Sequence, residues 1–93
     1  MLILHKHRNF EEQLLEIADS DNTRFEVLTM IIEWGLRNID RLPDALLSQL
    51  EVESNIFMLE IIKSHHCEHE LMVMFKYIRG SNSLTILSVR GVN

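Results

Sequence analysis

The sequence is poor in cysteine, proline and glycine, and each scarcity excludes a class of protein. Its 93 residues contain one cysteine, Cys67, so no disulfide can form within the chain, and a reducing cytoplasm is the expected compartment. One proline and three glycines predict regular elements with short connections rather than a loop-rich scaffold. No apolar run is long enough to span a bilayer or to form a signal-peptide core, so neither a membrane location nor export is expected.

Length and composition predict a single domain covering residues 1–93. A second core would leave each half too small to fold unaided. Hydrophobic residues make up 46% and charged residues 25% of the chain, which is typical of globular proteins. The formal net charge of -5 disfavours a nucleic-acid partner, because phosphate binding needs a basic surface. Residues 1–53 hold 11 of the 14 acidic side chains, and a solvated acidic helical face is favoured over a designed charge asymmetry.

Residues 9–40 are predicted to form a hairpin of two helices. Asn9 with Glu12, and Thr23 with Glu26, have the spacing of capping boxes at two helix starts. A polar break at residues 19–22 separates the helices, and the first is expected to be about two turns long. Apolar side chains recur at helical spacing after each cap: Phe10, Leu14 and Ile17, then Phe25, Leu28, Ile32, Leu36 and Ile39. The apolar stripes of the two helices must be buried against another part of the chain.

The rest of the chain has the composition of strands. Residues 2–7 predict an opening strand, and residues 56–63, 71–78 and 84–90 predict an antiparallel meander. Residues 44–50 are either a short helical turn or an extended connection, because Pro43 blocks further helix before them. The predicted fold class is α+β, with the helix hairpin packed on a mainly antiparallel sheet of three to four strands, in the order β-α-α-β-β-β.

Alternation along residues 71–78 places apolar side chains on both faces of the middle strand, which is therefore expected to be central. Leu71, Val73, Phe75 and Tyr77 share one face, and Met72, Met74, Lys76 and Ile78 share the other. With Met58 and Ile62, the second face would expose an apolar patch, and we expect a second copy of the chain or another protein to bury it. The chain purified alone is therefore predicted to be a homodimer. The alternative is that residues 44–53 fold back as a third helix over the same patch.

His65, His66, Cys67 and His69 crowd one loop and are the donor types that zinc prefers. Structural zinc sites join two separated ligand pairs, and this cluster has no second pair nearby, so an exposed loop is favoured. Cys67 has His66 beside it in sequence, but a cysteine nucleophile also needs a lowered pKa and a base in hydrogen-bond reach. The sequence therefore predicts neither a metal nor another cofactor.

A set of basic side chains in the second half has the chemistry of a ribonuclease that needs no metal. Cleavage requires a base for the 2′-hydroxyl, cations for the phosphate and an acid for the leaving oxygen. These groups are available from Lys63, His65, Lys76, Tyr77, Arg79 and Arg90. The alternative is that Lys and Arg on exposed strands only prevent unwanted pairing of sheet edges.

Several segments of residues 35–92 follow one another in an order that resembles a known family. They are the Leu42-Pro43 turn, the apolar strand of residues 56–61, the aromatic strand of residues 73–78 leading into Gly80, and the closing strand of residues 87–92. The pattern resembles the RelE/ParE/HigB superfamily of type II toxin-antitoxin toxins, including phage-derived HigB-like proteins. The resemblance implies a bacterial toxin, either an mRNA endonuclease at the ribosome or a gyrase inhibitor, that an antitoxin neutralises.

The resemblance also implies roles for individual residues. Arg90 takes the place of the basic residue near the end of the family's last strand, and Lys63 falls near its second-strand arginine, so both are expected to contact phosphate. Lys76, Arg79 and His65 are auxiliary catalytic candidates.

The sequence departs from the family in two respects. The arginine expected near residues 71–72 is replaced by Leu71-Met72, and the chain is acidic where the family is commonly basic. Both departures favour an alternative function, a catalytically silent protein-binding module of a mobile element that keeps the fold. An adaptor, an immunity protein or an antitoxin-like protein would be of this kind.

Overall fold

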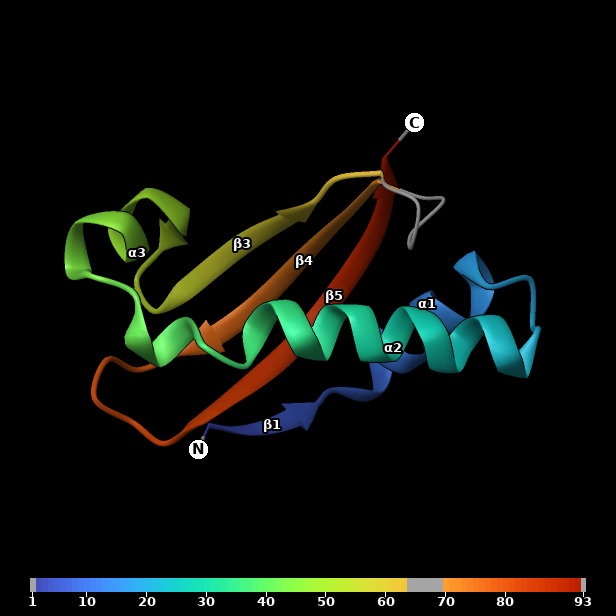
Figure 1. Ribbon diagram of the computed structural model, residues 1–93, viewed down its shortest axis with the longest axis horizontal. Coiled ribbons are helices and arrows are strands. Elements are labelled where there is room, and N and C mark those ends of the chain that lie inside the picture. Colours follow the sequence, from blue (N-terminus) through green and yellow to red (C-terminus); the bar gives the residue numbers. More distant parts are fainter. Residues whose placement is uncertain (1, 64–69, 93) are drawn as a thin grey trace.

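The computed structural model describes residues 2–63 and 70–92 and has an α+β fold (Figure 1). Its elements run in the order β1 (Ile3–Lys6), α1 (Arg8–Ile17), α2 (Asn22–Leu36), the 3-10 turn η1 (Ile39–Arg41), α3 (Asp44–Leu50), β2 (Glu51–Glu53), β3 (Ile56–Ile61), β4 (Glu70–Tyr77) and β5 (Ser83–Val92). The predicted fold class, a helix hairpin on a mainly antiparallel sheet, is confirmed. Within the described residues, no helix has the length and hydropathy that crossing a bilayer requires.

The sheet has five strands in the order β1-β5-β4-β3-β2, so β4 is central as predicted. Strands β3, β4 and β5 pair as the expected antiparallel meander, and β1 pairs in parallel with β5. The predicted count of three to four strands is one too low, because residues 51–53 form the short edge strand β2 beside β3. Three residues between a helix and a turn are too few to show the alternation of a strand.

Both predicted helix caps lie two residues too far along the chain. The first helix begins at Arg8, where the His7 Nδ1 accepts the Asn9 N–H at 3.1 Å. Helix α2 begins at Asn22, where Asp21 Oδ1 accepts the Arg24 N–H at 3.1 Å. In each helix, a polar side chain two residues before the predicted cap accepts a hydrogen bond from an exposed N–H group of the first turn. The earlier start also gives α1 ten residues rather than the expected two turns.

One face of the sheet and the helices share a single core. The buried side chains of this face are Phe57, Leu71, Val73, Phe75, Tyr77, Leu84, Ile86 and Val89, and the helices add Phe10, Leu14, Leu28, Ile32, Leu36 and Leu47. The Phe57 and Phe75 rings stack with their centroids 5.5 Å apart. In Figure 1, helix α2 lies across strands β4 and β5. The split of β4 into an inward and an outward set is as predicted.

Residues 44–50 form the helix α3, which settles the choice between a helical turn and an extended connection. Its buried residue Leu47 belongs to the same core as Phe57. The third helix therefore lengthens the helical layer and does not cover the methionine-bearing face. The alternative in which residues 44–53 cover that face is wrong.

Candidate functional site

The sheet face that points away from the helices is not covered by any other element of the described chain, and we call it the open face. Its side chains come from the three long strands: Ile56, Met58 and Glu60 of β3, Glu70, Met72, Met74 and Lys76 of β4, and Thr85, Ser88, Arg90 and Val92 of β5. None of these eleven side chains is buried, whereas the inward positions of the same strands mostly are. Five of the eleven are apolar and only half-buried, so the open face leaves part of its apolar area exposed.

The register of the strands arranges most of the open face in three rows. Glu60, Met72 and Arg90 form the first row, Met58, Met74 and Ser88 the second, and Ile56, Lys76 and Thr85 the third. Beyond the first row, Glu70 of β4 lies opposite Val92 of β5. Charged residues therefore stand at the two ends of the first row, and methionines occupy the middle of the face. Directly paired side chains lie about 5 Å apart at their Cβ atoms, so the methionines form one continuous patch.

Two residues that were expected in this patch lie outside it. Strand β3 ends at Ile61 and β4 ends at Tyr77, so Ile62 and Ile78 follow the strands and are not held on the sheet face by pairing. Both are largely exposed. The two-residue alternation cannot be extended past the last paired residue of a strand.

The structure places Arg90 and Lys63 at the same end of the sheet. Arg90 lies on the open face, where its Nη2 donates to Met72 Sδ at 3.2 Å. Lys63 is exposed two residues beyond Ile61, at the end where β3 and β5 both finish (Figure 1). These two of the predicted site residues are brought into one region of the molecule.

Lys76 and Arg79 lie at the opposite end. Lys76 is exposed on the open face, four residues along β4 from the row of Arg90, which corresponds to about 13 Å. The Arg79 Nη2 donates to Ser48 Oγ at 3.0 Å and lies 3.5 Å from Glu51 Oε1. This guanidinium therefore contacts α3 through Ser48 and β2 through Glu51. The four described cations therefore do not meet around one point.

The remaining predicted site residue, His65, lies outside the described residues. The same holds for His66, Cys67 and His69, the donors considered for zinc. Among the residues that the structure does describe, no group of three His, Cys, Asp or Glu side chains could hold a metal ion.

A second exposed apolar surface, which was not predicted from the sequence, lies along α2. Val27, Met30 and Trp34 are 46%, 68% and 78% exposed. They recur at intervals of three and four residues and so share one side of the helix, while Leu28 and Ile32 face the core. The signal was present in the sequence as a second helical stripe beside the buried one.

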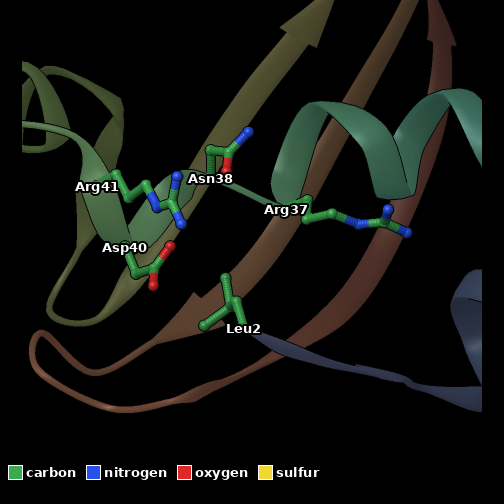
Figure 2. Close-up of a pocket in the computed structure, with 5 residues that line it drawn as sticks. All are labelled: Leu2, Arg37, Asn38, Asp40 and Arg41. Atoms are coloured by element: carbon green, nitrogen blue, oxygen red, sulfur yellow. The ribbon is translucent and has the colours of Figure 1, made fainter.

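A hollow of about 160 Å³ lies beside the end of α2, lined by Leu2, Arg37, Asn38, Asp40 and Arg41 (Figure 2). Two guanidinium groups suggest an anion, but in Figure 2 that of Arg37 points away from Arg41. The Asp40 carboxylate extends toward Arg41, and the carbonyl end of a helix repels anions. All four polar residues are exposed, so the hollow lacks the converging donors of an anion site.

Comparison of this chain with protein-family models, curated proteins and solved structures found no match.

Proposed function

We propose that this chain acts by binding a protein at the open face. The observation that carries the proposal is the contrast between the two faces of one sheet. The inward face is buried by helices, while the outward face has methionines on β3 and β4 and no buried side chain. Contiguous apolar patches on soluble proteins commonly mark interaction sites.

The composition of the open face supports a protein as the ligand. Methionine is flexible and polarisable, and it is common on surfaces that adapt to a partner chain. The open face also has charged residues at its margin, Glu60, Glu70, Lys76 and Arg90, around an apolar centre. This is the arrangement of a protein interface, with a dry middle and a polar rim.

Site-specific photocrosslinking tests the proposal. A photoreactive phenylalanine analogue placed at position 74 should give a covalent adduct with a protein when the chain is illuminated in the producing cell. The same analogue at Glu16, an exposed residue of α1, is the matched control and should give no comparable adduct. If position 74 reacts no more than position 16, the open face is not a protein-binding site.

A second candidate is a toxin-like activity of the RelE/ParE/HigB kind, directed at mRNA or gyrase and neutralised by an antitoxin. It is supported by the antiparallel meander of β3, β4 and β5 that follows the helix hairpin, and by the location of Lys63 and Arg90 at the same end of the sheet. Fold alone does not establish an activity, so this candidate depends on those two cations.

Induced expression in a bacterium without the neighbouring genes tests the second candidate. The chain should arrest growth, and Lys63→Ala with Arg90→Ala should abolish the arrest. Arg24→Ala is the control, because Arg24 is an exposed arginine of α2 that pairs with Asp19 at 3.3 Å. Normal growth with intact mRNA and unaltered DNA supercoiling at high expression would contradict the toxin.

A further inference from the structure

We draw no further inference here: the strongest candidate, the exposed apolar stripe of Val27, Met30 and Trp34 along α2, carries nothing, because it is an unpartnered helix face and nothing among the described residues shows what covers it.

Discussion

The guanidinium of Arg79 lies over the ring of Phe57, with its central carbon 5.7 Å from the ring centroid. The same group donates to Ser48 Oγ and approaches Glu51 Oε1 and Asp44 Oδ1 at 3.5 and 4.0 Å. Arg79 thus connects the end of β4 to α3 and β2. Its partners fit a structural role better than the auxiliary catalytic role for which the sequence made it a candidate.

Loss of these contacts should lower stability without touching the proposed binding surface. Arg79→Ala is expected to reduce the free energy of unfolding by about 1 kcal/mol, since a cation-π contact at a partly exposed site is worth about 0.5–1 kcal/mol and the surface ion pairs add little. Urea unfolding followed by circular dichroism measures the change. Arg79→Lys keeps the charge but not the planar fork, so it should recover only part of the loss. An unchanged unfolding midpoint for Arg79→Ala would contradict the role.

The start of α2 offers a direct comparison of the observed cap with the predicted one. Asp21→Ala removes the side-chain acceptor of the Arg24 N–H and should cost about 1 kcal/mol. Thr23→Ala changes the cap that the capping-box spacing predicts and should shift stability by less than about 0.5 kcal/mol, because Thr23 is an exposed residue within the first turn. Thermal unfolding of the two variants distinguishes these outcomes. A larger loss from Thr23→Ala would mean that the helix begins at the predicted residue.

The inward face of β4 should be far more sensitive to truncation than the open face. Phe75 is fully buried and stacks on Phe57, so Phe75→Ala is expected to cost about 3–5 kcal/mol. Lys76→Ala, at the next position and on the other face, should change stability by less than about 0.5 kcal/mol. If Phe75→Ala does not fold, Phe75→Leu should still unfold at lower urea than the natural chain. Equal effects at positions 75 and 76 would contradict the assignment of the two faces.

The features predicted correctly from the sequence were those set by residues close together in the chain, such as the two faces of β4 and the helix hairpin. The two faces of β4 follow from alternation along eight residues, because one face is buried and any shift by one position would expose Phe75 and Val73. The helix hairpin follows from the spacing of Phe10, Leu14 and the later stripe. Both helix caps were predicted two residues too late, because His7 and Asn9, like Asp21 and Thr23, are competing acceptors two residues apart.

Strand pairing and register between segments far apart in the chain could not be predicted from the sequence. The parallel alignment of β1 with β5 joins residues about 80 positions apart, and no local pattern encodes it. The separation of Lys76 from Arg90 follows from strand register, which composition does not reveal. The stripe of Val27, Met30 and Trp34 was visible in the sequence, but only the structure shows that it is the exposed one of two apolar sides of α2.

The edge of β5 supplies the last prediction. Strand β1 pairs with β5 only at residues 83–86, and α1 follows the same edge beyond that point. The His7 N–H donates to the Ile86 carbonyl at 2.8 Å, and Gln13 Oε1 accepts the Val89 N–H at 2.9 Å. The amide of Gln13 thus satisfies a backbone donor that an adjacent strand would otherwise satisfy.

Gln13→Leu keeps the size of the side chain but removes the acceptor, so the Val89 N–H is left without its partner in a half-buried position. The free energy of unfolding should fall by about 1 kcal/mol, and the Val89 amide should exchange its hydrogen faster. Gln13→Glu retains an oxygen at the same place and should preserve both properties. Hydrogen exchange followed by nuclear magnetic resonance resolves the Val89 amide, and equal protection in the Leu and Glu variants would show that the contact with Gln13 does not stabilise this edge.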